Sequence, residues 1–233
     1  MGVISITRIA GLIGEAGRIQ MLMVLLDGNS HSASELAMAA AVSPQTATSH
    51  LSKLRLGGLV VSERSGRQQL FRLKNADVAV AIEALGALAR NSETHAIPEM
   101  RFARTCYDHL AGVLAIALQK ELLRRGALRP WKNGFLVTPA GSQLLLTLEI
   151  DTDSLSALRR SFAHQCLDWT ERHYHIGGAV GAALLSRFIE TKWLARMRHT
   201  RAVRLTHAGE RGFEHIFGIR CATLRTRPAI VPE

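Results

Sequence analysis

The first third of the chain shows helical apolar periodicity interrupted by short polar segments. Apolar residues recur every three or four positions over residues 6–26, which predicts one amphipathic helix. Two short helices are predicted next, over 33–40 and 44–56, because Ser32 and Ser43 precede them as N-terminal caps and a proline opens the second. Two short helices joined by a tight turn are typical of a helix-turn-helix, whose second helix contacts DNA bases.

A period of two follows the second short helix. Residues 59–64 and 67–73 alternate as strands do, and Ser65 and Gly66 are predicted to form the turn between them. This β-hairpin would be the wing of a winged helix-turn-helix. A further amphipathic helix is predicted over 77–90. Together with the first helix it leaves more apolar surface than one small domain can cover, which favours a homodimer interface.

The polar side of the second short helix carries the candidate DNA contacts. Its side chains are donors and acceptors of the kind that reach base edges, and it has no carboxylate. Over residues 43–75, Glu63 is the single acid among several basic residues that could contact phosphates. The predicted DNA-binding residues are Ser43, Gln45, Thr46, Thr48, Ser49, His50, Lys53, Arg55, Arg64 and Arg67.

Two segments of the C-terminal half resemble each other. Cys106-Tyr-Asp-His109, followed by a glycine and an apolar helix, is similar to Cys166-Leu-Asp, which is followed after an insertion by His175, two glycines and another apolar helix. A Thr-x-Ala-Gly element occurs downstream of both. An internal repeat of this kind predicts two similar lobes related by a pseudo-twofold axis.

The predicted fold class is mainly α with small β-wings (α+β). We expect a winged helix-turn-helix domain for DNA binding and dimerisation over 1–97. A C-terminal effector-sensing domain is expected over 98–233, built from helical, winged-helix-like lobes over about 101–150 and 160–220. Residues 91–98 are polar, close with a proline, and have the composition of a linker.

The repeated cysteines and histidines are candidates for effector sensing. Cys106 and His109 are three residues apart, which would place them on one face of a helix near its start, where the dipole and the imidazole lower a thiol pKa. Pseudo-symmetry would bring Cys106 and Cys166 to equivalent places, where they could bind a soft metal or metalloid, or be oxidised. In the other interpretation these two cysteines, His109 and His175 are ordinary buried core residues.

Two further features bear on the effector. Four aromatic residues, Tyr107, Trp131, Trp169 and Tyr174, could line a pocket for a small organic molecule. A basic stretch over 187–227 could extend the phosphate contacts, lie in solvent, or bind an anionic effector. The sequence identifies neither a cofactor nor a particular metal.

Composition agrees with a DNA-binding role. The formal net charge of +10 favours a polyanionic partner, because basic side chains release counterions when they neutralise phosphates. Three widely spaced cysteines do not form the disulfide framework of a secreted domain, so we expect a cytoplasmic protein. No signal peptide or membrane segment is expected, since the longest uncharged stretch, 133–148, contains glycine and proline and is shorter than the ~20 apolar residues that span a bilayer.

The N-terminal motifs resemble those of the ArsR/SmtB family of repressors. The resemblance covers about residues 6–95 and is carried by Glu35-Leu-Ala, Val42-Ser, Gln45-Thr-Ala-Thr-Ser-His-Leu-Ser-Lys-Leu and Gly57-Gly-Leu-Val before the hairpin turn. It implies a homodimer that places its recognition helices in successive major grooves of an operator and releases it when an effector binds. The family's usual metal sites do not carry over, because residues 35–40 contain no cysteine and residues 77–81 no histidine.

The expected function is therefore that of an ArsR-type transcriptional repressor and not of an enzyme. The alternative is a thiol-dependent enzyme that uses Cys106 or Cys166 beside a histidine. The glycine-rich segment over 177–181 does not support the enzyme as a cofactor-binding motif. This segment is predicted to lie within a helical repeat and not after a strand. Loss of operator binding on adding a ligand would favour the sensor, and catalytic turnover would favour the enzyme.

Overall fold

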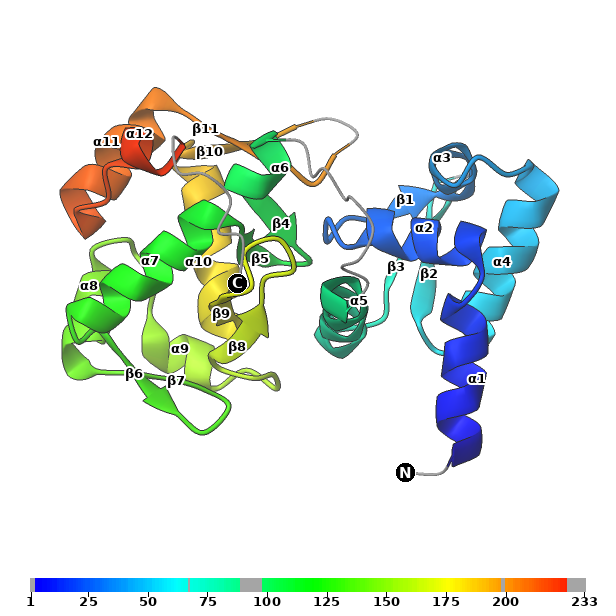
Figure 1. Ribbon diagram of the computed structural model, residues 1–233, viewed down its shortest axis with the longest axis horizontal. Helices are drawn as coiled ribbons and strands as arrows, with labels where there is room; N and C mark the ends of the chain where they lie inside the picture. Colours follow the sequence, from blue (N-terminus) through cyan, green and yellow to red (C-terminus); the bar gives the residue numbers. More distant parts are fainter. Residues whose placement is uncertain (1–2, 67, 89–97, 198–199, 226–233) are drawn as a thin grey trace. The chain divides into compact units, whose positions relative to one another are not determined.

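The computed structural model describes residues 3–66, 68–88, 98–197 and 200–225, and its elements are labelled in Figure 1. These residues belong to two compact units, Met1–Ile82 and Glu83–Glu233. The division between the units falls within helix α5 (Ala76–Leu88), which begins and ends close to its predicted bounds. Residues 91–97 of the predicted linker lie outside the described residues.

The first unit is a winged helix-turn-helix, as predicted. Leucines and a methionine of its helices form a buried core, and a three-stranded sheet in the order β1-β3-β2 packs beside it. The elements before α5 are α1 (Val3–Ile13), α2 (Ala16–Leu25), β1 (His31–Ser32), α3 (Ala33–Ala39), α4 (Pro44–Leu56), β2 (Val60–Ser65) and β3 (Gln68–Leu73).

The single helix predicted over 6–26 is wrong, because the chain breaks between α1 and α2. Glu15 adopts an extended backbone, and its carboxylate accepts hydrogen bonds from the backbone N–H groups of Gly17 (3.0 Å) and Arg18 (2.9 Å), which caps α2. The Arg18 guanidinium donates to the carbonyls of Gly11 (2.8 Å) and Leu12 (2.6 Å) at the end of α1. Side chains therefore satisfy both helix ends, and the apolar period continues across the break.

The wing turn lies one residue later than predicted. Strands β2 and β3 pair from Val60 opposite Leu73 to Ser65 opposite Gln68, so the connecting residues are 66 and 67. Gly66 has a φ of 59°, a left-handed conformation that glycine adopts without steric cost. The wing itself is confirmed, but Arg67 lies outside the described residues.

In the second unit, the order strand–strand–helix–strand–strand–helix occurs twice, so the fold is mixed α and β, as predicted. The first set is β4 (Arg104–Cys106), β5 (His109–Ala111), α7 (Val113–Arg124), β6 (Leu128–Trp131), β7 (Gly134–Val137) and α8 (Pro139–Leu146). The second set is β8 (His164–Leu167), β9 (Tyr174–Gly177), α10 (Gly178–Glu190), β10 (Leu194–Arg196), β11 (Val203–Leu205) and α11 (His207–Phe217). Short helices α6 (Pro98–Phe102), α9 (Thr152–Ser156) and α12 (Cys221–Arg225) complete it. That the two sets are related by a pseudo-twofold axis stays a prediction.

The same local contacts occur at matching places in the two sets. Gly112 and Gly178 precede or open α7 and α10 with φ values of 91° and 82°, and a Cβ on either would lie 2.6 Å from a backbone carbonyl oxygen. Thr138 and Thr206 cap α8 and α11 by accepting a backbone N–H three residues on, at 3.1 and 3.0 Å. Only glycine fits the first pair of positions, which explains the repeated glycine in the sequence.

The two sets share one hydrophobic core and are not separate bodies. Helix α10 packs against β5 as well as against β9, and α7 packs against both β9 and β5. Leu114 on α7 and Val180 and Phe188 on α10 are fully buried in this common core. Strands β6, β7, β8 and β9 form one sheet. This sheet joins the β6–β7 hairpin of the first set to the β8–β9 hairpin of the second set. The hairpins β4–β5 and β8–β9 are consequently held side by side.

Candidate functional site

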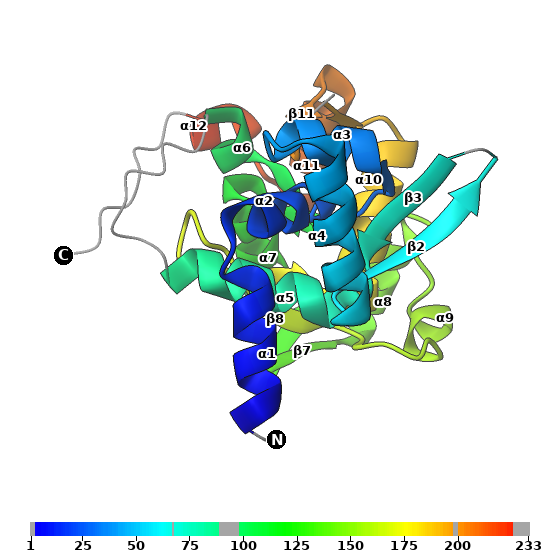
Figure 2. The same ribbon diagram turned by 90° about the vertical axis from the view of Figure 1, so that its right-hand side faces the viewer.

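Helix α4 of the first unit presents the predicted polar face to solvent. Ser43 caps the helix by accepting the Thr46 backbone N–H at 3.1 Å, and the Thr48 hydroxyl donates to the Pro44 carbonyl at 2.9 Å. Figure 2 shows α4 beside the β2–β3 hairpin, whose tip projects away from the helices of the unit. The predicted DNA-binding residues that are exposed are Ser43, Gln45, Thr46, Thr48, Ser49, Lys53, Arg55 and Arg64.

His50 is an exception, and the prediction that it faces outward is wrong. Its side chain is buried between α4 and α2, with Nε2 3.3 Å from a Glu15 carboxylate oxygen and Nδ1 3.5 Å from the Arg18 guanidinium. His50 lies within the inward face that begins at Ala47, because residues three and four apart share one side of a helix. It fixes α4 against the α1–α2 break and is not available to contact bases.

The four predicted sensing residues lie on β-strands and not on a helix, which corrects the sequence-based placement. Cys106 on β4 is directly opposite His109 on β5, and Cys166 on β8 is directly opposite His175 on β9. Helix α7 begins only at Val113, so Cys106 does not lie at the start of a helix as expected. The hydrogen bond to Cys166 and burial raise the pKa of the Cys106 thiol well above its usual value. The expected low thiol pKa is therefore wrong.

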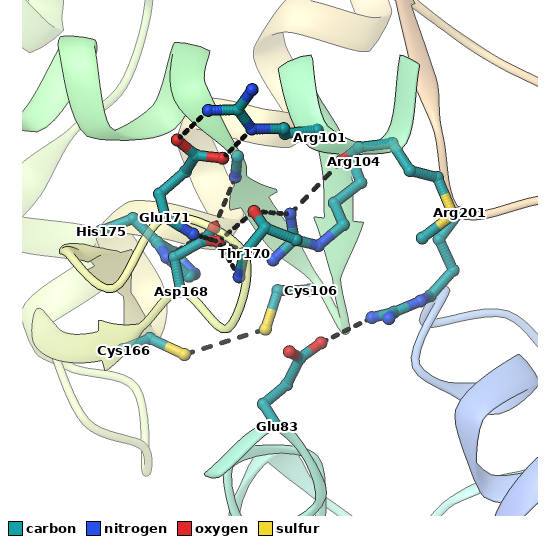
Figure 3. Close-up of polar contacts among 12 residues, drawn as sticks. Glu83, Arg101, Arg104, Cys106, Cys166, Asp168, Thr170, Glu171, His175 and Arg201 are labelled. Atoms are coloured by element: carbon teal, nitrogen blue, oxygen red, sulfur yellow. Dashed lines mark hydrogen bonds and ion pairs between the residues drawn. The ribbon is translucent and has the colours of Figure 1, made fainter. Parts of the chain in front are cut away.

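The structure does bring these four side chains together, and all four are buried. The sulfur atoms of Cys106 and Cys166 are 3.8 Å apart, and the two Nε2 atoms of His109 and His175 are 3.1 Å apart. One sulfur or nitrogen atom from each residue lies within 4.8 Å of the others. Figure 3 shows the two cysteine side chains, one from β4 and one from β8, pointing toward each other. We call these four residues the thiol–imidazole cluster.

Two aspartates flank the thiol–imidazole cluster. A carboxylate oxygen of Asp108 lies 3.3 Å from Nδ1 of His109, and one of Asp168 lies 3.6 Å from Nδ1 of His175. Burial alone would raise the pKa of the Asp168 carboxyl, but the Arg104 guanidinium at 2.9 Å holds it well below its usual value. Sequence reasoning missed both aspartates, although each occurs two residues after a repeated cysteine.

The Asp168 carboxylate also holds the two hairpins together. It accepts hydrogen bonds from the Gly112 backbone N–H (2.7 Å) and the Thr170 hydroxyl (2.7 Å), and Arg104 donates to Thr170 at 3.1 Å. Figure 3 shows these contacts linking β4 to the loop that follows β8. The loop is therefore fixed at the place where the cluster forms.

The four aromatic residues of the predicted pocket are not among the residues that line the cavity beside α6. Trp131 and Tyr174 are largely exposed, and Trp169 lies against the Arg104 guanidinium. A cavity of about 650 Å³ lies elsewhere, between α6, α7, β11 and α12, and Arg101 and Arg204 are among its lining residues.

Two arginines of the basic stretch over 187–227 form ion pairs within the second unit. Arg187 forms an ion pair with Glu149 at 2.7 Å, and Arg201 is buried and paired with Glu83.

None of the helices in the described ranges has both the length and the apolar character needed to span a membrane.

The glycine-rich segment over 177–181 also differs from its prediction, because it directly follows strand β9. Its glycines are explained by close packing, since a Cβ on Gly181 would lie 2.2 Å from the carbonyl oxygen of Ile176.

Comparison with known proteins gives one similarity over nearly the whole chain. The chain is 39% identical over 222 residues to YdfF of Bacillus subtilis (strain 168), described as an uncharacterized HTH-type transcriptional regulator, and the match covers 93% of this chain and 98% of YdfF. No protein-family profile matches the chain.

Three solved structures are similar to a smaller part of the chain. The winged helix-turn-helix fragment 1–100 of Mb0332 from Mycobacterium bovis, described as a possible ArsR-family regulator, is 26% identical and covers 40% of this chain and 85% of its own, with a TM-score of 0.36. Reduced HlyU from Vibrio cholerae is 27% identical over 38% of this chain and 92% of its own, with a TM-score of 0.34. The cadmium sensor CmtR from Mycobacterium tuberculosis is 29% identical over 36% of this chain and 84% of its own, with a TM-score of 0.31.

Proposed function

Since this chain belongs to the HTH-type transcriptional regulators, we propose that it is a repressor that binds duplex operator DNA as a homodimer. Helix α4 lies in the major groove, and the β2–β3 wing contacts the neighbouring phosphate backbone. An effector bound by the second unit lowers the affinity for the operator. The thiol-dependent enzyme is not favoured, because both candidate nucleophiles are buried and the pKa of the Cys106 thiol is raised.

The observation that carries this proposal is the composition of the exposed face of α4. Gln45, Ser49 and Lys53 are exposed and lie four residues apart, so they form one row along the helix. Such a row extends about 12 Å at 1.5 Å per residue, which matches the width of a major groove. Amide and hydroxyl groups can contact base edges and the ammonium group a phosphate, while no carboxylate on α4 repels the DNA.

Exposed apolar side chains support the homodimer. Ile6 on α1 and Val80, Leu85 and Leu88 on α5 are exposed, and Leu88 keeps 80% of its surface accessible. Apolar side chains concentrated on two helices are stabilised when a second copy covers them.

Fluorescence anisotropy of the full chain on two duplexes tests the DNA contacts. One duplex is selected by the protein from a random pool and the other has a random sequence. Lys53→Ala is expected to weaken binding to both and to lower the slope of log affinity against log salt by about one. Gln45→Ala is expected to cost about 1–3 kcal/mol on the selected duplex and little on the random one.

Lys120→Ala is the matched control, because Lys120 is an exposed lysine on α7 of the second unit. Its affinity and salt slope should equal those of the parent. Equal salt slopes for the parent and Lys53→Ala, or equal losses for Lys53→Ala and Lys120→Ala, would contradict the placement of α4 on DNA.

A further inference from the structure

Each of the two neighbouring hairpins presents one thiol and one imidazole on the same side. Cys106 and His109 are paired across β4 and β5, and Cys166 and His175 are paired across β8 and β9. Directly opposed residues in an antiparallel pair project from the same face, with Cβ atoms about 5 Å apart. Each hairpin therefore supplies half of a four-ligand set, and the packing of β5 beside β9 brings the halves together.

Two distances within the thiol–imidazole cluster match the edges of a tetrahedron around one metal ion. Zinc–sulfur bonds of about 2.3 Å and zinc–nitrogen bonds of about 2.0–2.1 Å place the two sulfurs about 3.8 Å apart and the two nitrogens about 3.3 Å apart. The observed separations are 3.8 Å between the sulfurs and 3.1 Å between the Nε2 atoms. The sulfur-to-nitrogen edges of such a tetrahedron are about 3.6 Å long. The four ligand atoms all lie within 4.8 Å of one another, so the side chains must close in by at most about 1.2 Å to surround the ion.

Both imidazoles are oriented as metal ligands usually are. In metal sites the ring nitrogen that does not bind the ion generally donates to a carboxylate. Here Nδ1 of His109 faces Asp108 and Nδ1 of His175 faces Asp168, which leaves both Nε2 atoms directed into the cluster. Nδ1 of His175 is buried, and no hydrogen-bond partner is within normal distance. A shift of a few tenths of an ångström toward Asp168 would complete that bond.

Each carboxylate is fixed by an arginine from the other set of elements. Asp168 after β8 pairs with Arg104 on β4 at 2.9 Å, and Asp108 after β4 pairs with Arg160 before β8 at 2.7 Å. These crossed ion pairs fix both carboxylates beside the imidazoles, where a carboxylate that accepts the Nδ1 hydrogen orients a histidine ligand.

The charge of the site also fits a divalent ion. Two cysteine thiolates and one divalent cation sum to zero, so the filled site places no net charge in the core. Binding releases the thiol protons to solvent as each sulfur forms its bond to the metal. The four ligands are 1–3% exposed, which leaves no open position for a substrate and matches closed zinc sites rather than catalytic ones.

We propose that the thiol–imidazole cluster is a closed tetrahedral binding site for one Zn²⁺ ion, which joins the β4–β5 and β8–β9 hairpins. The site stands on residues of the second unit alone, so it holds whether or not α4 binds DNA. The thiol–imidazole cluster does not correspond to the usual metal sites of the ArsR/SmtB family, because those sites would lie within the first unit.

Titration of the full-length protein with Co²⁺ tests the site, because Co²⁺ takes the place of Zn²⁺ and reports its own geometry by absorption. The protein is stripped with a chelator under reducing conditions first. We expect one Co²⁺ per chain, the intense visible bands of tetrahedral Co²⁺ with a sulfur-to-metal charge-transfer band, and loss of both on adding Zn²⁺. Weak octahedral bands alone would overturn the proposal.

Cysteine variants separate the ligands from a general effect of thiols. Cys106→Ser and Cys166→Ser should each lose the charge-transfer band at stoichiometric Co²⁺. Cys221→Ser is the matched control, since Cys221 is also a buried free thiol but lies outside the cluster, and it should bind as the parent does. A parent-like titration of Cys106→Ser, or a Cys221→Ser variant that fails in the same way, would refute the assignment.

X-ray absorption of the unmodified, zinc-loaded protein does not depend on how variants fold. The expected shell is two sulfurs at about 2.3 Å and two nitrogens at about 2.0 Å. A shell without sulfur would refute the site. A second result would also refute it: the reduced protein binds no Zn²⁺, and mass spectra show that air converts Cys106 and Cys166 to a disulfide. The two cysteines would then be a redox couple.

Discussion

Removal of the Asp168 charge should destabilise the second unit far more than removal of an exposed carboxylate charge. The side chains of Asp168 and Arg104 are both 0% exposed, so Asp168→Asn leaves a guanidinium in the core without its counter-ion. Breaking a buried pair in this way costs about 3–5 kcal/mol. Arg104 keeps two other acceptors, the Thr170 hydroxyl and the Met100 carbonyl, so we expect the lower end, about 3 kcal/mol.

Tryptophan fluorescence measures this loss in the second unit alone. The three tryptophans of the chain, Trp131, Trp169 and Trp193, all belong to that unit. Unfolding is followed with a chelator present, so that metal binding does not contribute. For a unit of this size, 3 kcal/mol lowers the thermal midpoint by about 6–12 °C.

Two further variants decide whether the unpaired charge is the cause. Glu121→Gln removes a partly exposed carboxylate that pairs with Arg124 and Arg125 at the surface, and surface pairs contribute only about 0–1 kcal/mol each. Arg104→Met combined with Asp168→Asn removes both charges and should recover part of the loss. If Asp168→Asn costs no more than Glu121→Gln, the guanidinium reaches solvent and the buried-pair reasoning is refuted.

Four other predictions concern the metal, pH and DNA. Asp108→Asn should weaken Zn²⁺ binding about 10–100-fold in competition with a chromophoric chelator, and unchanged affinity would exclude the carboxylate from the site. The pair formed by His31 and Asp27 raises the pKa of the histidine and lowers that of the carboxyl. The pair therefore stabilises the first unit at about pH 5.5, and this stabilisation is lost toward pH 9. His31→Gln should accordingly destabilise the first unit only at the lower pH. Unfolding of the first unit is followed by circular dichroism. His50→Ala should reduce that stability without changing the ratio of selected to random DNA affinity, whereas Gln45→Ala should change the ratio. If Zn²⁺ is the effector, it should weaken DNA binding, and DNA should then weaken Zn²⁺ binding by the same factor, so an operator affinity that saturating Zn²⁺ leaves unchanged would contradict this role.

Local signals in the sequence were sufficient for the helix-turn-helix. Ser32 and Ser43 act as caps in the structure, and the proline at the first position of α4 predicted where that helix begins. The break between α1 and α2 could not be predicted, because it depends on where the Arg18 side chain finds its acceptors and the apolar period does not mark it. His50 was misplaced for a related reason, since an imidazole can occupy either a polar surface or a buried face with partners.

The β4–β5 hairpin was missed because a spacing of three has two structural meanings. Residues three apart share a helix face, and they are also directly opposed across a two-residue hairpin turn. The turn between Cys106 and His109 is Tyr107 and Asp108, and Tyr107 takes a positive φ of 59° that is uncommon outside glycine, asparagine and aspartate. No glycine marks the turn, so the pattern favoured the helix.

The two sequence-based interpretations of the cluster, as core residues or as a sensor, are compatible in the structure. Each hairpin carries only two ligands, so a four-ligand site exists only while the hairpins are packed together, and the free energy of metal binding adds to the free energy of folding. Without a metal, the same four side chains are buried and pair among themselves, as core residues do. A sensor built this way must therefore respond through the stability of the second unit, since filling the site changes how firmly the hairpins are joined.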